Sequence, residues 1–148
     1  MVQVPDYVVI QEELQTLIVG GVPEFAHVFI EGAEEEVGNL SNMPLANIRL
    51  TETVDELVRL PSGYNEQATL LVDIIAFDFT SYLSAARLRG ALLASTRRLL
   101  LTNREFSSQI LTSQLSGNTT FGAYGVENNS GSVAMATLTV TCELDIEA

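Results

Sequence analysis

The end of the chain alternates between apolar and polar residues over a longer stretch than any other segment. The apolar positions are Leu138, Val140, Cys142, Leu144 and Ile146, and the polar positions between and after them are Thr139, Thr141, Glu143, Asp145 and Glu147. A period of two is that of a β-strand with one face on a core and the other towards water. From Ala134 to Ile146 such a strand is about 40 Å long at about 3.3 Å per residue. Because most strands are shorter, we expect this one to extend beyond its own sheet.

A second strong strand is predicted at Ala68–Phe79, which is apolar at both parities. A strand with two apolar faces is covered on both sides, so we expect it at the centre of the sheet. The other expected strands are Phe25–Glu31, Ala46–Thr51, Asp55–Leu60 before the turn Pro61–Gly63, Ile110–Leu115, and Thr119–Glu127 paired with Ser132 onward around the turn Asn128–Gly131. The segment Glu34–Asn42, with three glutamates followed by Gly and Asn, is predicted as a loop.

Two helices are predicted. The first covers residues 6–19, where Asp6 suits the N-cap and the pair Gly20–Gly21 suits the end. The second runs from Tyr82 to Leu101, with Thr80 or Ser81 as its cap, and is about 30 Å long. Strands, a long helix and a closing hairpin predict a single α+β domain over residues 1–148. Its mostly antiparallel sheet is expected to carry the N-terminal helix and the long central helix on one face.

The long helix has apolar residues on two nearly opposite sides. One stripe contains Leu83, Leu93, Leu100 and Leu101 with the small residues Ala86, Gly90 and Ala94, and the other contains Leu88, Leu92 and Leu99. A helix at the surface of a domain needs only one apolar stripe. The second stripe therefore requires a cover, from the same chain or from a neighbouring copy. We expect a neighbour, because the helix has more apolar surface than one chain can bury.

The formal net charge is −12, and all seven basic residues are arginine. This charge is the wrong sign for a dedicated nucleic-acid-binding protein or for docking on an anionic membrane. It fits either general solubility or a surface that must not adhere to DNA. Four arginines, Arg87, Arg89, Arg97 and Arg98, fall in the long helix. Arginine forms bidentate contacts with carboxylates, so these residues fit an interface, and equally fit pairing within the chain.

The sequence predicts no catalytic residue, metal site or cofactor. His27 has no candidate partner in sequence, and Cys142 lies on the apolar parity of the last strand, where it acts as a small hydrophobic residue. The phosphate-binding loop pattern is absent. Asp73 and Asp78 are separated by five residues, which places them on opposite faces of a strand and disfavours joint acid–base chemistry. No apolar run approaches the about 20 residues of a membrane span, and we expect no secretory signal.

The order of these elements resembles that of the tail-terminator, or tail-completion, proteins of long-tailed bacteriophages. The resemblance lies in the N-terminal helix, the central strand Leu70–Phe79 leading directly into the helix Tyr82–Leu101, the polar stretch after it, and the final alternating strand Leu138–Ile146. It covers most of the chain and is one of architecture. Members of this family form hexameric rings that cap the tail tube, join tail to head, and have neither enzymatic activity nor cofactor.

The resemblance implies specific roles for parts of this chain. The implied subunit or tail interface comprises Arg87, Arg89, Leu88, Leu92, Arg97, Arg98 and Leu99, and the implied channel-lining segment comprises Glu34, Glu35 and Glu36. The last strand would join an intersubunit sheet. The implied partners are five further copies of the chain, a tail-tube protein and neck or connector proteins. DNA would pass through without specific binding, at a head–tail junction assembled in the host cytoplasm and without a membrane.

Two alternatives remain open at this point. Within the same virion, the chain would be a head-completion protein, a neck adaptor or a tail-tube subunit, since tube proteins share related folds and also form rings. From a different class, it would be a cellular domain that binds a small ligand between helix and sheet, with Asp73, Asp78 or His27 as polar groups.

Overall fold

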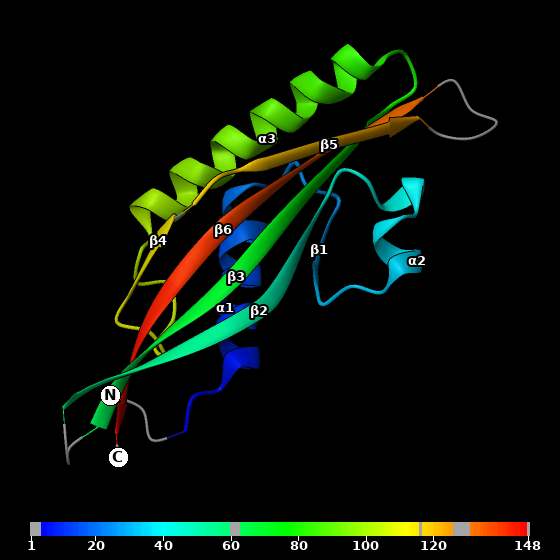
Figure 1. The fold of residues 1–148 in the computed structure, drawn as a ribbon. Coiled ribbons are helices and arrows are strands. Elements are labelled where there is room, and N and C mark those ends of the chain that lie inside the picture. Colours follow the sequence, from blue (N-terminus) through cyan, green and yellow to red (C-terminus); the bar gives the residue numbers. More distant parts are fainter. Residues whose placement is uncertain (1–3, 60–62, 116, 126–130, 148) are drawn as a thin grey trace.

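The computed structural model describes residues 4–59, 63–115, 117–125 and 131–147. The elements in chain order are α1 (Tyr7–Gly21), β1 (His27–Ile30), α2 (Glu34–Val37), the 3-10 turn η1 (Leu40–Asn42), β2 (Leu45–Arg59), β3 (Gly63–Asp78), α3 (Tyr82–Thr102), β4 (Thr112–Leu115), β5 (Thr120–Gly125) and β6 (Ser132–Glu147). They form the predicted α+β fold, in which α3 runs along the sheet beside β5 and β6 (Figure 1).

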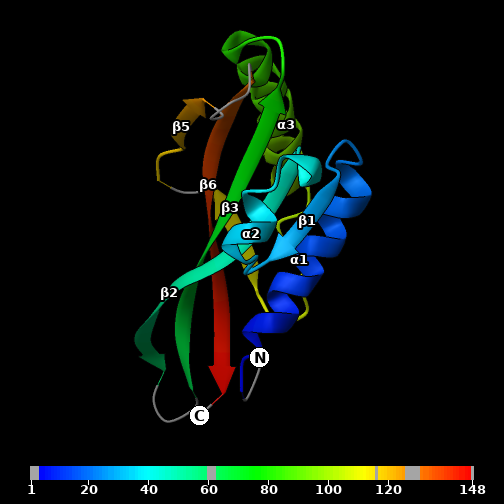
Figure 2. The ribbon, with the colours of Figure 1, turned by 90° about the vertical axis from the view of Figure 1, so that its right-hand side faces the viewer.

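The sheet has six strands in the order β1-β2-β3-β6-β4, and β5 also pairs with β6. Only β1 and β2 are parallel; the other pairs are antiparallel. The prediction that the strand within Ala68–Phe79 is central is confirmed, because β3 lies between β2 and β6. Figure 2 shows the twist of the three long strands, as expected from the handedness of the polypeptide.

The last strand is as long as predicted, but it does not extend beyond its own sheet. β3 matches β6 residue for residue, from Gly63 opposite Glu147 to Asp78 opposite Ser132. On its other edge β6 pairs with β5 and β4. The expectation that β6 extends beyond its own sheet is therefore wrong, because an equally long strand of the same chain pairs with it over its whole length. A role of β6 in an intersubunit sheet is a property of an assembly, so it stays a prediction.

Two other sequence predictions also need correction. The segments Ala46–Thr51 and Asp55–Leu60 belong to one strand, β2, whose pairing register with β3 shifts between Leu50 and Glu52. Such a bulge interrupts the alternation without ending the strand. The end of the second segment and most of the turn after it, residues 60–62, lie outside the described residues. The predicted loop Glu34–Asn42 instead contains α2 and η1.

The helix boundaries follow the predicted caps closely. The Asp6 carboxylate accepts a hydrogen bond of 3.1 Å from the Val9 amide at the start of α1. The Ser81 hydroxyl accepts one of 3.1 Å from the Ser84 amide at the start of α3. Each satisfies an amide that has no partner within its helix. α1 includes both Gly20 and Gly21 and ends at Gly21, and β1 begins at His27.

The main core lies between one face of the sheet and the two long helices, which cover the same side (Figure 2). α1 contributes Ile10, Leu14 and Ile18, α3 contributes Leu92, Leu93 and Leu100, and the long strands contribute residues such as Ile48, Val72, Ile74, Leu138 and Val140. A smaller cluster on the opposite face consists of Leu45, Ile75 and Val133, packed under side chains of α2 and η1. Both faces of the central strand β3 are therefore covered around Ile74 and Ile75, as its apolar residues at both parities predict.

Candidate functional site

Cys142 and His27, two of the residues considered in the sequence for chemistry, lie in surroundings that serve the fold. Cys142 is fully buried, and this burial raises the pKa of its thiol to about 12, so the thiol is neutral at physiological pH. His27 is exposed on β1 and stacks on Phe29, with ring centroids 5.5 Å apart. Among the described residues, no group of three or more His, Cys, Asp or Glu side chains is arranged to hold a metal ion.

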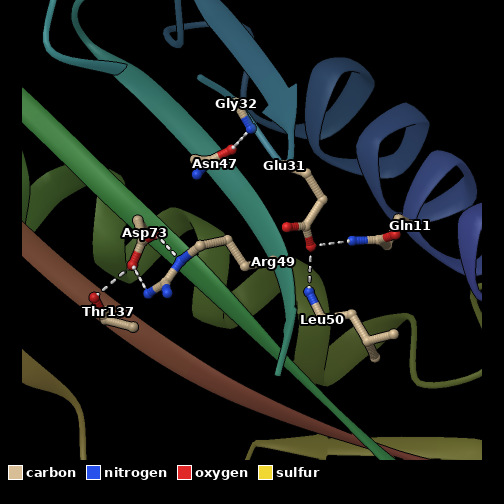
Figure 3. A network of polar contacts seen from close by, with 8 residues as sticks. All are labelled: Gln11, Glu31, Gly32, Asn47, Arg49, Leu50, Asp73 and Thr137. Atoms are coloured by element: carbon tan, nitrogen blue, oxygen red, sulfur yellow. Dashed lines mark hydrogen bonds and ion pairs between the residues drawn. The ribbon is translucent and has the colours of Figure 1, made fainter. Parts of the chain in front are cut away.

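Asp73 and Asp78 have separate partners, as their spacing predicts. Both carboxylate oxygens of Asp73 bind the Arg49 guanidinium, at 2.6 Å from Nε and 3.0 Å from Nη2, and Oδ1 also accepts from the Thr137 hydroxyl at 2.7 Å (Figure 3). Asp78 accepts hydrogen bonds from Thr80, which lower the pKa of its carboxyl. The Arg49–Asp73–Thr137 contact ties together β2, β3 and β6, the three strands that form the centre of the sheet.

Three further hydrogen bonds fasten the segment directly after β1 to its neighbours (Figure 3). One oxygen of Glu31 accepts from the Gln11 side chain of α1 at 3.0 Å and from the Leu50 amide of β2 at 2.7 Å. The buried Asn47 side chain accepts from the Gly32 amide at 2.8 Å. Because each contact joins different elements, this network holds the sheet edge and α1 in place and offers no open reaction centre.

A buried carboxyl group lies under the first turn of α1. Glu66, only 3% exposed, accepts a hydrogen bond from the Tyr7 hydroxyl and faces Asp55 directly across β2 and β3. Burial, together with Asp55, raises the pKa of the Glu66 carboxyl above its usual value, against the opposing effect of the Tyr7 hydrogen bond. Burial and the same hydrogen bond raise the pKa of Tyr7. This group couples the start of α1 to the β2–β3 hairpin.

The surface hollows are shallow and lie away from these polar groups. One of about 530 Å³ is lined by Glu34, Glu35, Gly38 and Asn39, and one of about 390 Å³ by residues 102–106. A third, of about 310 Å³, lies between Tyr82 at the start of α3 and the end of β5. A ligand site normally encloses most of its ligand and lines it with convergent polar groups. These hollows do not have that form.

The second leucine stripe of the long helix is covered within the chain. Leu92 is only 2% exposed and belongs to the main core, and Leu88 and Leu99 are half-buried against the same core. The expectation that a neighbouring copy must bury this stripe is therefore wrong for Leu92. The physical reason is that α3 lies against β3 and β6 and also approaches the end of α1, where Leu99 packs on Gly21.

The large leucines that are exposed on α3 come from the first predicted stripe, the one with the small residues Ala86, Gly90 and Ala94. Leu83 is 66% exposed and Leu101 is 59% exposed. A helical projection gives the positions of residues relative to one another around the helix axis. It does not say which side of the helix packs against the sheet. The exposed leucines of α3 therefore lie outside the stripe that was expected to need a neighbouring copy.

The four arginines of α3 fall into two pairs. Arg89 donates to the Gly122 and Met135 carbonyls and lies 4.9 Å from the centre of the Phe121 ring, and Arg97 donates to the Thr119 hydroxyl at 2.5 Å. These two residues fasten β5 and its preceding turn to the helix. Arg87 and Arg98 are exposed, and neither has a hydrogen bond or ion pair within the part of the chain that the structure describes.

The acidic segment Glu34–Glu36 forms most of α2. Glu36 accepts from the Ala33 amide at 3.0 Å and so caps its own helix. Glu34 and Glu35 are exposed. α2 lies on the flank of the sheet opposite α3 (Figure 1). Its position relative to a channel is a property of an assembly, so the predicted channel-lining role stays a prediction.

Sequence reasoning missed how strongly the charge is divided along the chain. Residues 79–126 contain five of the seven arginines and one acidic residue, Glu105, whereas the remaining residues contain two arginines and eighteen acidic residues. The structure places α3, β4 and β5 from this segment on one flank of the molecule. A count of charges in windows along the sequence was the signal that would have found this basic flank.

Large aromatic residues gather where β5 ends and α3 begins, another feature that the sequence did not reveal. Phe79, Tyr82, Phe121 and Tyr124 are each between 43% and 65% exposed. Phe79 directly follows β3, Tyr82 begins α3, and the other two belong to β5. Tyr82 and Tyr124 line the same hollow, and the Arg89 guanidinium lies over the rings of both Tyr82 and Phe121, because β5 pairs along β6 beside the helix.

No helix among the described residues combines the length and apolar character needed to cross a bilayer. The candidate site is an external surface: the long helix α3, with exposed leucines and two arginines that have no hydrogen bond or ion pair among the described residues, beside the exposed strand β5.

These features define an α+β protein with a twisted, mostly antiparallel sheet and two helices on one face. No protein-family model matches the chain, and no curated protein matches its sequence. Among solved structures, the fold is similar to that of a chain in the virion of a native gene transfer agent particle. The similarity has a TM-score of 0.52 at 12% sequence identity, and covers 95% of this chain and 99% of that chain. At this identity the comparison shows a shared fold.

Proposed function

We propose that this chain is a structural component of a phage-like virion and, within it, a ring-forming tail terminator at the head–tail junction. The observation that carries the proposal is the shared fold with a virion chain, which extends over nearly the whole length of both chains. A match of that extent leaves little of either chain outside the common fold. The finer role rests on the element order, in which a central strand leads directly into a long exposed helix.

The surface found on α3 supports a role in assembly rather than in catalysis. An exposed helix with large leucines and unpaired arginines fits protein contact, since arginine is enriched at such interfaces and their buried core is more apolar than the rest of the surface. In the proposed assembly, six copies of the chain form a ring, as in the family that the chain resembles, between a tail-tube protein and neck proteins. DNA passes through the ring without specific binding.

Immunogold labelling of purified particles tests the virion role directly. Antibodies against this chain are expected to label intact particles at the junction of head and tail, and mass spectrometry is expected to find the chain in them. Particles that lack the chain, or label distributed along the whole tail, contradict a terminator. Label along the whole tail favours the tail-tube alternative, because a tube subunit is present at every level of the tail.

The behaviour of the purified chain separates the remaining virion roles. A terminator is expected to form discrete rings and to bind the end of isolated tail tubes. A tube subunit grows into long tubes instead, and a head-completion or neck adaptor protein binds heads that lack tails. Electron microscopy of the chain alone and mixed with tails or heads distinguishes these three outcomes.

A further inference from the structure

One side of α3 faces away from the rest of the chain. Its residues lie three or four positions apart, apart from the adjacent pair Gly90 and Ala91, as expected for one face of a helix. All of them are exposed: Leu83, Arg87, Gly90, Ala91, Ala94, Arg98 and Leu101. We call this set the outer stripe of α3. Its centre has only small side chains, which allow another chain to approach closely. The exposed leucines Leu83 and Leu101 lie at its two ends. Arg87 and Arg98 lie between these leucines and the small residues of the centre.

The two arginines of the outer stripe are placed to meet acidic groups. Arg87 and Arg98 are eleven residues apart, which is about three turns and about 16 Å along the helix. Neither has a partner among the described residues, whereas Arg89 and Arg97 are bound to β5 and its preceding turn. α3 contains no acidic residue. An unpaired guanidinium next to exposed leucines favours a contact that supplies carboxylates.

The division of charge in the chain indicates what that contact is. The flank with α3, β4 and β5 is basic, and the rest of this strongly acidic chain supplies the opposite charge. Two copies related by a twofold axis with α3 against α3 would bring Arg87 of one copy towards Arg98 of the other, so like charges would meet. A contact between the basic flank of one copy and an acidic flank of the next avoids this repulsion.

α2 is the acidic element on the opposite flank. Glu34 and Glu35 are exposed next to each other, and Glu36 is occupied as the cap of the helix. α2 and α3 lie on opposite sides of the sheet in Figure 1. A contact between unlike surfaces on opposite flanks repeats from copy to copy and closes into a ring when the rotation permits.

We infer that copies of this chain associate head to tail, with the outer stripe of α3 of one copy against α2 of the next, so that Glu34 and Glu35 lie between Arg87 and Arg98. The inference rests on the proposed function, since it describes how the ring is built. It gives Glu34 and Glu35 a role at the subunit contact in place of the channel. The contact is electrostatic in part, so it weakens with salt, whose screening length is about 10 Å at 0.1 M.

A charge-swap experiment in the full chain tests this pairing. The first variant carries Arg87→Glu and Arg98→Glu, and the second carries Glu34→Arg and Glu35→Arg. Each variant alone is expected to associate about a hundredfold less than the wild type by sedimentation velocity at low salt, because like charges then face each other. Mixed in equal amounts, the two variants are expected to associate again. Both contact surfaces are acidic in the first variant and basic in the second, so every contact in a ring of alternating variants joins opposite charges.

Glu12→Arg with Glu24→Arg is the matched control, because it changes the net charge by the same amount as the second variant at exposed residues outside α2. It is expected to associate like the wild type. All substituted residues are exposed, and matching circular dichroism and unfolding midpoints verify that each variant folds.

The inference is overturned if the wild type is monomeric at every concentration, if either variant associates normally, or if the mixture stays dissociated. These outcomes are distinct from failure of the proposed function. A chain that is found in particles but associates through another surface keeps its virion role, whereas a chain that is absent from particles loses that role whatever its association in solution.

Discussion

Arg49 reaches from β2 to Asp73 on the central strand, with its Nε 2.6 Å from one carboxylate oxygen and its Nη2 3.0 Å from the other. The arginine side chain is 41% exposed and the aspartate side chain 11%. The hydrogen bonds that Arg49 donates to Asp73 raise the pKa of the Arg49 guanidinium. Since Thr137 of β6 donates to the same carboxylate, one aspartate links three strands.

Replacing this aspartate by asparagine is expected to weaken the sheet. Asp73→Asn keeps the size of the side chain but loses the charge that holds Arg49, at a cost of about 1–2 kcal/mol in the free energy of unfolding. Urea unfolding followed by circular dichroism measures the change. Thr137→Val removes only one of the three contacts and is expected to cost less. Equal midpoints for the wild type and Asp73→Asn contradict a structural role for the ion pair.

The carboxyl group of Glu66 is expected to make stability depend on pH in the mildly acidic range. Its pKa is raised in the folded chain, so the folded state binds this proton more tightly than the unfolded state. Stability from this group is present below its unfolded pKa and is lost as the pH rises through the folded value. Glu66→Gln keeps an acceptor for Tyr7 and removes the charge opposite Asp55. We expect it to stabilise the chain at neutral pH by about 1 kcal/mol.

Urea unfolding of the wild type and Glu66→Gln at several pH values checks this expectation. The advantage of the variant is expected to shrink as the pH falls and the wild-type carboxyl becomes protonated. Tyr7→Phe serves as a second probe, because it leaves the buried carboxylate without its hydroxyl donor and is expected to destabilise by about 1 kcal/mol at neutral pH. An advantage that is constant across the pH range contradicts the role of the Glu66 charge.

The two glycines at the end of α1 are expected to respond oppositely to alanine. A Cβ on Gly21 would lie 2.5 Å from Leu99 Cδ1, whereas a Cβ on Gly20 would meet nothing within 4 Å. Gly20→Ala is expected to stabilise by up to about 1 kcal/mol, because alanine restricts the unfolded chain. Gly21→Ala is expected to destabilise by about 1–3 kcal/mol, because it crowds a packed contact.

The double substitution Gly21→Ala with Leu99→Ala tests the cause of that crowding. Thermal unfolding of the two single variants and the double variant gives the interaction energy between the positions. We expect the loss from Gly21→Ala to be smaller when Leu99 is already shortened. Additive losses mean that the two positions are not in contact, and a stabilising Gly21→Ala means that α1 and α3 are further apart than in this structure.

Arg89 is expected to control how firmly β5 is held. Its guanidinium stacks on Phe121 and donates to the Gly122 and Met135 carbonyls at 3.2 and 3.3 Å. β5 has all six residues exposed and pairs with β6 alone, so these contacts are a large share of its anchoring. Arg89→Ala is expected to speed amide hydrogen exchange in β5 about tenfold or more, since each cation–π contact contributes about 0.5–2 kcal/mol.

Arg87→Ala is the matched control for this experiment, because Arg87 is on the same helix and has no partner among the described residues. It is expected to leave exchange in β5 unchanged. Exchange that is equally fast in the wild type and Arg89→Ala shows instead that backbone pairing with β6 alone holds the strand.

Shortening the leucines of α3 is expected to separate folding from association. Leu92→Ala removes a core side chain and is expected to cost about 2–5 kcal/mol of the free energy of unfolding. Leu101→Ala removes an exposed side chain and is expected to change that free energy by less than about 0.5 kcal/mol. Urea unfolding under dissociating salt conditions compares the two. A small loss for Leu92→Ala contradicts its placement in the main core.

Patterns within single elements could be predicted well from the sequence. The cap residues Asp6 and Ser81 act as N-caps of α1 and α3, since capping depends on a few neighbouring residues. The alternation of β6 places Leu138 and Val140 in the core for the same local reason. The α+β class followed from the number and order of such elements.

Relations between elements required the tertiary structure. The bulge after Leu50 that continues β2 as one strand depends on its pairing with β3. The length of β6 carried no information about its partner, which proved to be an equally long strand of the same chain. The side of α3 that packs on the sheet could likewise not be predicted from the helix sequence. The rotation of α3 about its own axis buries Leu92 and exposes Leu101.

The sequence by itself determined the two long helices and the long strands β3 and β6, where α1 and α3 begin, and that acidic residues far outnumber the seven arginines. Only the tertiary structure decided which leucines of α3 the chain buries, that Arg89 and Arg97 are occupied while Arg87 and Arg98 are not, and that the basic flank and α2 lie on opposite sides. The physical reason is range: caps and periodicity act within a few residues, whereas burial and charge separation depend on contacts between segments distant in the chain.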